Sequence, residues 1–266
     1  MNKQRTAKKL INLALALILF ALVPAISLGA EDDFVIKDGV LIKYNGTDTE
    51  IIIPDDVTSI GEWAFGNYQI FKSGALGPNN PHSKFITSII IPDSVEILGG
   101  YVFDVFYGCQ SLTAITVGEN NSNYLSIDGV LFSKDKTELI KYPIAKSETS
   151  YDIPNGVIYI ARDAFYDCKN LTNINFPDGL KEIGDYAFEH CESLTSVVLP
   201  DSVKSIGYLV FNGCNSLISI VMNNVTIIGY GAFHGCDNLT IHARSGSYAE
   251  RYAKYNKIKF EELQYE

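Results

Sequence analysis

The feature that most constrains this chain is a repeat with an almost constant period. Cys168, Cys191 and Cys214 lie 23 residues apart, and Cys236 follows after 22, which places a one-residue deletion near residues 222–224. A unit of this length is too small to bury its own apolar face, so the units must stack on one another. The period therefore predicts a solenoid. Four phenylalanines mark the same register: Phe165, Phe188, Phe211 and Phe233.

Each unit is expected to contain two short strands and a closing turn. In "LTSVVLPDSVKSIGYLVFNGC", residues 194–214, Pro200 marks the bend after the first strand, because proline cannot donate to a strand ladder. We expect the inward positions to be Leu194, Val197 and Leu199 on the first strand, Val203 and Ile206 on the second, and Phe211 and Cys214 in the turn.

The pattern "LTSVVLPDSVKSIGxxxFxGC" resembles the BspA-type leucine-rich repeats, and the resemblance runs from about residue 33 to residue 260. Two earlier copies are looser: residues 51–65 lack the cysteine, and residues 89–109 carry four extra residues before Phe106. The resemblance implies a mainly β solenoid of ~23-residue coils. It says less about function, because the family is described as surface and adhesion proteins without a shared active site.

Two segments read as β-hairpins. "DGVLIKY" at 38–44 is echoed by "DGVLF" at 128–132 and "LIKYP" at 139–143. Asp-Gly between alternating residues is a strong signal for a two-residue hairpin turn. We expect the first hairpin to cap the open end of the solenoid. We expect the second to project between coils, where it extends the sheet or offers a contact surface.

The C-terminal segment is expected to close the other end with a strand and a helix. Ser247 is a candidate helix N-cap, and Glu250 completes a capping box. The alternative is that this Tyr-rich helix docks a partner. The helical face expected to lie on the last coil is Tyr248, Ala249, Tyr252 and Ala253, with Tyr255.

The start of the chain has the layout of a secretory signal peptide. Lys3, Arg5, Lys8 and Lys9 precede an apolar run at 10–23, and "SLGA" supplies small residues before the acidic "EDD". We expect cleavage after residue 29 or 30, a secreted or cell-surface location, and no membrane span after cleavage. The alternative is an uncleaved anchor, for which the apolar run is short.

The chain is accordingly divided into a signal peptide and a single leucine-rich-repeat domain. A stretch rich in Gly, Pro and Asn reads as a surface loop between the first coils. The expected boundaries are 1–30 for the signal peptide and 31–266 for the domain, with 34–50 as hairpin cap, 51–117 as first coils with a loop insert at 66–84, 118–150 as hairpin insert, 151–238 as regular coils and 239–266 as C-terminal cap.

Charge and motif content argue against two classes of function. With 21 basic and 31 acidic side chains, the net charge is −10, so nucleic acid is not an expected partner. The sequence has no phosphate-binding Gly loop, no GxSxG elbow and no HExxH motif. We therefore expect no enzyme activity and no cofactor.

The cysteines and histidines are expected to be structural. All five cysteines occupy one repeat position, where a buried thiol is a small apolar filler, and parallel stacking does not favour the convergent Cβ vectors of a disulfide. His190 and His234 lie close to Cys191 and Cys236, but their side chains are expected to face outward, away from the cysteines. We expect free core thiols and no metal site.

The candidate binding residues are those that the repeats leave exposed. Outward positions of the first strands form a small, uncharged stripe, which about six coils would extend over ~30 Å. The turns after the second strands carry aromatic residues, which either form a contact surface or pack as a ladder that covers the core. The stripe is Ser88, Ile90, Thr116, Asn173, Asn175, Ser196, Val198, Ser219 and Val221, with Ala114 beside it; the aromatics are Trp63, Tyr186, Tyr208 and Tyr230.

Such a surface suits a broad macromolecular partner better than a small molecule. The leading hypothesis is an exported repeat protein that mediates protein–protein or cell-surface and matrix adhesion. The alternative is a carbohydrate-binding or substrate-capture module that uses Tyr208 and Tyr230 as sugar platforms. The oligomeric state is left open.

Overall fold

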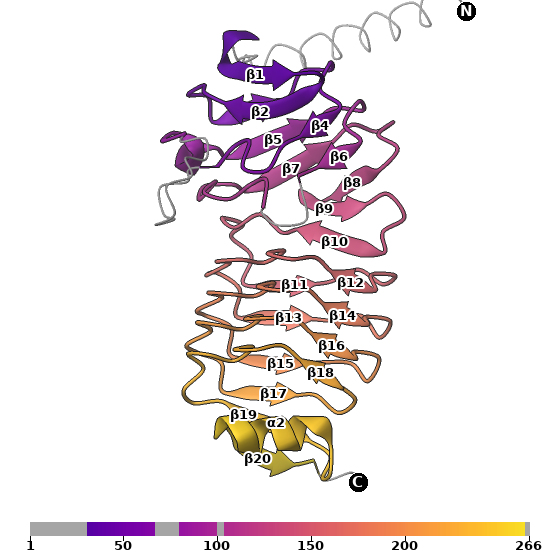
Figure 1. Cartoon of the computed structure of the whole chain (residues 1–266), viewed down its shortest axis with the longest axis vertical. Coiled ribbons are helices and arrows are strands. Elements are labelled where there is room, and N and C mark those ends of the chain that lie inside the picture. Colours follow the sequence, from indigo (N-terminus) through magenta and orange to yellow (C-terminus); the bar gives the residue numbers. More distant parts are fainter. Residues whose placement is uncertain (1–30, 67–79, 100–103, 264–266) are drawn as a thin grey trace, which may run out of the picture.

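The structure, a computed structural model, describes residues 31–66, 80–99 and 104–263. The predicted signal peptide and residues 67–79 of the predicted loop insert lie outside these ranges. The described chain is mainly β and winds as a solenoid in which each coil adds one strand to each of two stacks (Figure 1). Two single-turn 3₁₀ segments, Glu31–Asp33 and Ser83–Phe85, accompany the strands.

The first strands of the coils form parallel sheets along one side, which we call the first-strand sheets. They break into three groups along the solenoid. The groups are β3 (Glu50–Ile52), β5 (Ser88–Ile91) and β7 (Ala114–Val117); β11 (Ser150–Asp152) and β13 (Asn173–Asn175); and β15 (Ser196–Val198), β17 (Ser219–Val221), β19 (Thr240–Ala243) and β20 (Lys259–Glu262).

The second strands form the other stack, the second-strand sheets. Ser205 of β16 pairs with Ile227 of β18, so the one-residue deletion lies between Val221 and Ile227, as predicted. The strands are β4 (Ser59–Ile60) and β6 (Ile97–Leu98) with the first hairpin, and β12 (Tyr159–Ile160), β14 (Glu182–Ile183), β16 (Ser205–Ile206) and β18 (Ile227–Ile228) with β8 (Tyr124–Ile127), β9 (Val130–Ser133) and β10 (Glu138–Lys141).

Both predicted hairpins are present, and both turn at Asp-Gly. Strands β1 (Phe34–Lys37) and β2 (Val40–Tyr44) are antiparallel, as are β8 and β9. Asp128 and Gly129 have φ of 50° and 78°, the left-handed values that a two-residue hairpin turn requires and that glycine adopts without strain. Asp38 and Gly39 have φ of 52° and 75°.

Of the two roles predicted for the second hairpin, the structure shows the extension of the sheet. It extends the second-strand sheets, and β9 is buried on both faces. Because neighbouring side chains of a strand point to opposite faces, Leu131 packs into an N-terminal core while Val130 and Phe132 pack into a C-terminal one. Strand β9 is therefore the wall between the two cores.

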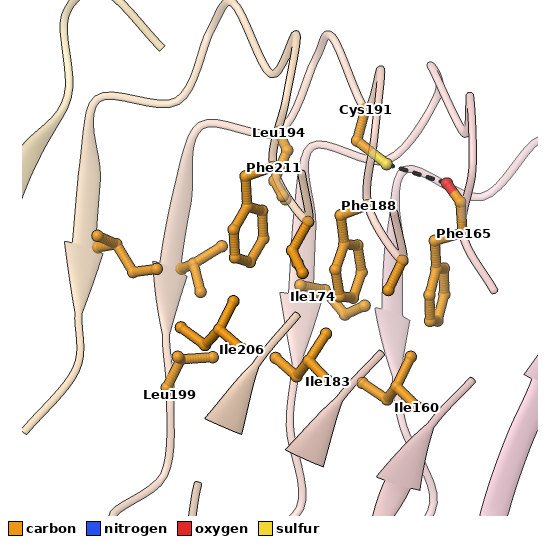
Figure 2. Close-up of a cluster of buried hydrophobic side chains, with 14 of the residues drawn as sticks. Ile160, Phe165, Ile174, Ile183, Phe188, Cys191, Leu194, Leu199, Ile206 and Phe211 are labelled. Atoms are coloured by element: carbon orange, nitrogen blue, oxygen red, sulfur yellow. Dashed lines mark hydrogen bonds between the residues drawn. The ribbon is translucent and has the colours of Figure 1, made fainter. Parts of the chain in front are cut away.

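The C-terminal core is a ladder of stacked rings (Figure 2). The ring centroids of Phe165, Phe188, Phe211 and Phe233 are 4.8, 5.4 and 5.6 Å apart, with interplanar angles of 12°, 8° and 3°. Burying one such side chain contributes about 1.5–3 kcal/mol, which each coil gains only when its neighbour covers it. All the predicted inward residues of 194–214 are buried.

The C-terminal cap contains the predicted helix, α2 (Tyr248–Asn256). The Ser247 side chain accepts a hydrogen bond from the Glu250 N–H at 3.2 Å, as expected of an N-cap. Ala249 and Ala253 are buried, but Tyr255 is 88% exposed, so its predicted place on the inner face is wrong. Strand β20, which pairs with β19, was not predicted.

Candidate binding surface

The stripe predicted on the first strands does face outward. Ser196 pairs with Ser219, and Val198 pairs with Val221 one rung along, so the side chains form two columns. Inner positions of these strands are buried, whereas Val198 is 63% exposed. None of the four side chains carries a charge. This group on β15 and β17 is the apolar part of the stripe.

The remaining stripe residues lie on other sheets. Ser88, Ile90 and Thr116 are outward residues of β5 and β7, while Asn173 and Asn175 are on β13. β7 does not continue to β11, because the Ile115 N–H donates instead to the carbonyl of Gly129 in the second hairpin at 2.9 Å. The stripe is therefore interrupted by the hairpin.

The two asparagines are held by hydrogen bonds along their columns. Asn175 Nδ2 donates to Asp152 Oδ1 at 2.6 Å, and Asn173 Nδ2 donates to Ser150 Oγ at 3.2 Å. This end of the stripe is polar and is ordered by its own ladder.

The predicted turn aromatics occupy two repeat positions rather than one. Tyr186 lies two residues before Phe188, in left-handed backbone with φ 58°, and the Arg162 guanidinium covers its ring at 4.6 Å. Tyr208 and Tyr230 lie three residues before their phenylalanines and are 56% and 83% exposed. The sequence alone distinguishes these two repeat positions, because they differ in the number of residues that separate them from the repeated Phe.

Trp63 shares the position of Tyr186 and supports the ladder interpretation at that position. It is buried, and its ring stacks on Tyr107 at a centroid distance of 6.3 Å. Exposed aromatic residues and aromatic residues packed in a covering layer are thus both present, at adjacent positions of the turn. Of the four predicted turn aromatics, Tyr208 and Tyr230 are the two that are more than half exposed.

All five cysteines are free and buried, as predicted. They also make hydrogen bonds, which the sequence reading missed because it treated the thiol as an apolar filler. Burial raises the pKa of Cys168 and of Cys236 to about 12, so the thiols stay protonated as donors. Each of three Sγ atoms lies 3.1 Å from a carbonyl oxygen of the preceding coil: Cys191 to Phe165, Cys214 to Phe188 and Cys236 to Phe211.

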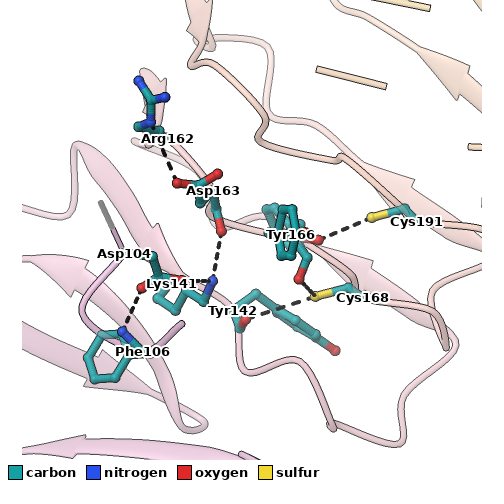
Figure 3. Close-up of polar contacts among 10 residues, drawn as sticks. Asp104, Phe106, Lys141, Tyr142, Arg162, Asp163, Tyr166, Cys168 and Cys191 are labelled. Carbon is teal, nitrogen blue, oxygen red and sulfur yellow. Dashed lines mark hydrogen bonds and ion pairs between the residues drawn. The ribbon is translucent and has the colours of Figure 1, made fainter. Parts of the chain in front are cut away.

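A buried polar cluster joins the two cores (Figure 3). Lys141 Nζ pairs with the Asp104 carboxylate and donates to the Asp163 carbonyl at 2.8 Å; the Lys141 and Asp104 side chains are each 7% exposed. Burial opposes charge on Lys141, but Asp104 outweighs it and raises the lysine pKa. Burial, and then the Asp104 charge, raise the pKa of Asp163 to about 7.

Nothing in the sequence marked this cluster, because the strand pattern of β10 gives Lys141 no special place. Its geometry is that of a structural ion pair, which ties a turn of the N-terminal core to the second hairpin and the next coil. Within the described ranges, no group of three or more His, Cys, Asp or Glu side chains is arranged to hold a metal ion. Over the same ranges, no helix is long and apolar enough to cross a membrane.

Solved structures with similar folds come from bacteria. A leucine-rich repeat protein from Eubacterium ventriosum is 26% identical with a TM-score of 0.58 over 74% of this chain and 59% of its own. A leucine rich cell surface protein from Faecalibacterium prausnitzii is 27% identical with a TM-score of 0.54 over 79% of this chain and 56% of its own. The pneumococcal vaccine antigen PcpA is 25% identical with a TM-score of 0.53, over 81% and 68%.

This chain therefore spans somewhat more than half the length of the first and second of these structures. A comparison with curated protein sequences gave no match. A family model described as "BspA type Leucine rich repeat region" matches six copies, over residues 43–103, 81–149 and 144–257. The repeat register, the stacked strands and these matches together place the chain in the BspA-type leucine-rich repeat family.

Proposed function

We propose that the protein is exported and acts as a non-enzymatic scaffold, whose first-strand sheets bind a protein of another cell surface or of the extracellular matrix. The observation that carries this proposal is the apolar part of the stripe, where uncharged columns on β15 and β17 leave Val198 63% exposed. Exposed apolar residues gathered on one face mark interaction sites.

The shape of this surface supports a broad partner. Side chains repeat at each rung, about 4.8 Å apart, and the outward side chains of β15 and β17 carry no charge. A standard protein interface buries about 800 Å² on each side, an area that several rungs can supply. Two similar structures are described as a cell surface protein and a vaccine antigen, which supports a surface location.

A double variant, Val198→Glu with Val221→Glu, tests the proposal. Both side chains point outward, so the fold should be retained while charge replaces the apolar column of Val198 and Val221. On an array of extracellular-matrix and host-cell surface proteins, we expect binding by the wild type and at least tenfold weaker binding by the double variant.

The control is Ile227→Glu, which places one carboxylate, in place of the two of the double variant, on an exposed apolar residue of the second-strand sheets. It should bind as the wild type does, and circular dichroism should show all three proteins folded. Equal loss in the control, or no bound protein on the array, would contradict the proposal.

A second candidate function is carbohydrate binding. Tyr208 and Tyr230 follow neighbouring strands and are largely exposed, as a platform for a sugar ring requires. On a glycan array, Tyr208→Ala would then abolish a saccharide-specific signal, while Val198→Glu would leave it unchanged. An array without any saccharide signal rejects this candidate.

The export part of the proposal has its own test. Intact-mass analysis of the protein made in a secreting bacterium should show loss of about the first 29 or 30 residues, because signal peptidase cuts after small residues such as Gly29 or Ala30. A full-length mass in the soluble fraction would reject export through a cleaved signal.

A further inference from the structure

The closing turns of the coils form a hydrogen-bond ladder of their own. In each of three successive turns, three alternate backbone N–H groups donate to three carbonyls of the following turn, at 2.7–3.1 Å. The donors all lie on the side that faces the C-terminal end of the solenoid. The donors are Asp163, Phe165 and Asp167, then Tyr186, Phe188 and His190, then Leu209, Phe211 and Gly213; the last acceptors are Tyr230, Ala232 and His234.

The last turn has no following turn. Its equivalent donors are the N–H groups of Gly231, Phe233 and Gly235, and among the described residues they have no acceptor. The cap closes the core, since Tyr252 of α2 meets the Phe233 ring edge-on at 5.9 Å. It also extends the first-strand sheets through β20. It does not supply a rung to the edge of this turn.

A groove of about 680 Å³ runs beside this edge. One wall is the last turn, and the other is the end of α2 with the residues that lead into β20. Phe233, Cys236 and Leu239 form its buried floor, and polar side chains such as Asp237, Asn238 and Asn256 line its exposed walls. Lys257 lies on the rim and makes no ion pair with a described residue.

We infer that this groove binds an extended segment of a partner protein, which docks as the missing rung of the turn ladder. In the preceding coils the equivalent donors meet carbonyls at every second residue of the next turn, so a partner segment that offers alternate carbonyls can take the same place, by analogy with strand addition to an open sheet edge. Lys257 favours segments that carry an acidic side chain at that end of the groove.

This site is separate from the stripe on the first-strand sheets, so experiments can reject either proposal without rejecting the other. The probe is a displayed library of random 12-residue peptides, selected on the mature protein. Asn238→Trp and Asn256→Trp each place a bulky ring in the groove from an exposed position, one from each wall. Asn155→Trp makes the same change at an exposed turn elsewhere and is the matched control.

Selected peptides should bind the wild type, the Asn155→Trp variant and the Val198→Glu, Val221→Glu variant with equal affinity. Both groove variants should bind at least tenfold more weakly. Amide hydrogen exchange of the ¹⁵N-labelled protein should slow at Gly231, Phe233 and Gly235 when peptide is bound.

The inference would be overturned by no selected peptide, by equal binding of the groove variants, by unchanged exchange at the three amides, or by the same slowing with inorganic phosphate alone. Slowing that depends on protein concentration without peptide would assign the edge to a second copy of this chain, and would also overturn it.

Discussion

At the scale of single residues, the repeated cysteine has two roles. Its side chain fills a small buried space between coils, and its thiol donates to a carbonyl of the coil before. The acceptor is a turn carbonyl that already accepts a backbone N–H; Phe188 O, for example, accepts from Cys191 N at 3.2 Å. A residue at this position must therefore be small and must keep a donor.

The first prediction follows from that pair of roles. Cys214→Ser should be less destabilising than Cys214→Ala, because the hydroxyl can still donate to the Phe188 carbonyl, whereas alanine loses both the bond and the volume. We expect Cys214→Ala to cost on the order of 1–2 kcal/mol in urea unfolding. A serine variant less stable than the alanine variant would mean that the site selects for apolar volume alone.

Asp163 gives the second residue-scale prediction. Its folded pKa of about 7 is above the value of an unfolded aspartate, so the folded state binds the proton more tightly. Stability is then lost as pH rises from about 4 to about 7, since the buried carboxyl must ionise. Asp163→Asn keeps a residue that tolerates the observed φ of 55° and removes this titration.

The asparagine variant should therefore be more stable than the wild type at pH 8, and the difference should close toward pH 4. We expect the variant's free energy of unfolding at pH 8 to be larger by on the order of 1–4 kcal/mol, because each unit by which the Asp163 pKa is raised costs the ionised form about 1.4 kcal/mol. Thermal unfolding of both proteins across this pH range gives the comparison. Parallel pH profiles would show that Asp163 ionises in the fold as it does in the unfolded chain.

At the scale of elements, the two ends of the solenoid are the places where aggregation can begin. An open end exposes unpaired strand edges and an uncovered core, which promotes aggregation. Here β20 covers the edge of β19 and α2 covers the core through Ala249 and Ala253. The charged residues Lys259, Glu261 and Glu262 then make β20 itself a poor template for further pairing.

Deletion of residues 244–266 tests the role of this cap. The truncated protein should aggregate in light scattering or melt several degrees lower, because it loses both α2 and β20. A truncated chain that stays monomeric and equally stable would show that the last coil needs no cover.

Strand β9 shows why some elements resist prediction. The Asp-Gly turn was sufficient to place the hairpin, because its backbone geometry is local. The run Val130, Leu131 and Phe132 carries no alternation, which is typical of a strand buried on both faces. Which cores lie on the two sides depends on the coils that stack later, so the wall between them could not be read from the segment alone.

At the scale of the whole molecule, the repeat period was sufficient to predict most of the fold. The register of Cys and Phe predicted the stacking, the inward residues and the deletion before β18, because each coil repeats the same local solution. The ion pair of Lys141 with Asp104 and the unsatisfied edge at Gly231, Phe233 and Gly235 were not predictable. Both arise where the repetition stops, and the pattern contains no information about its own interruptions.

The central claim is that stacking builds a long surface whose apolar part on β15 and β17 meets the partner. Hydrogen-exchange mass spectrometry of the mature chain, alone and with a protein captured on the array, tests it most directly. Protection should rise in peptides covering residues 194–199 and 217–222 and stay constant in those covering the second-strand sheets. Protection that rises only outside these two peptides would contradict the claim and move the binding surface away from the first-strand sheets.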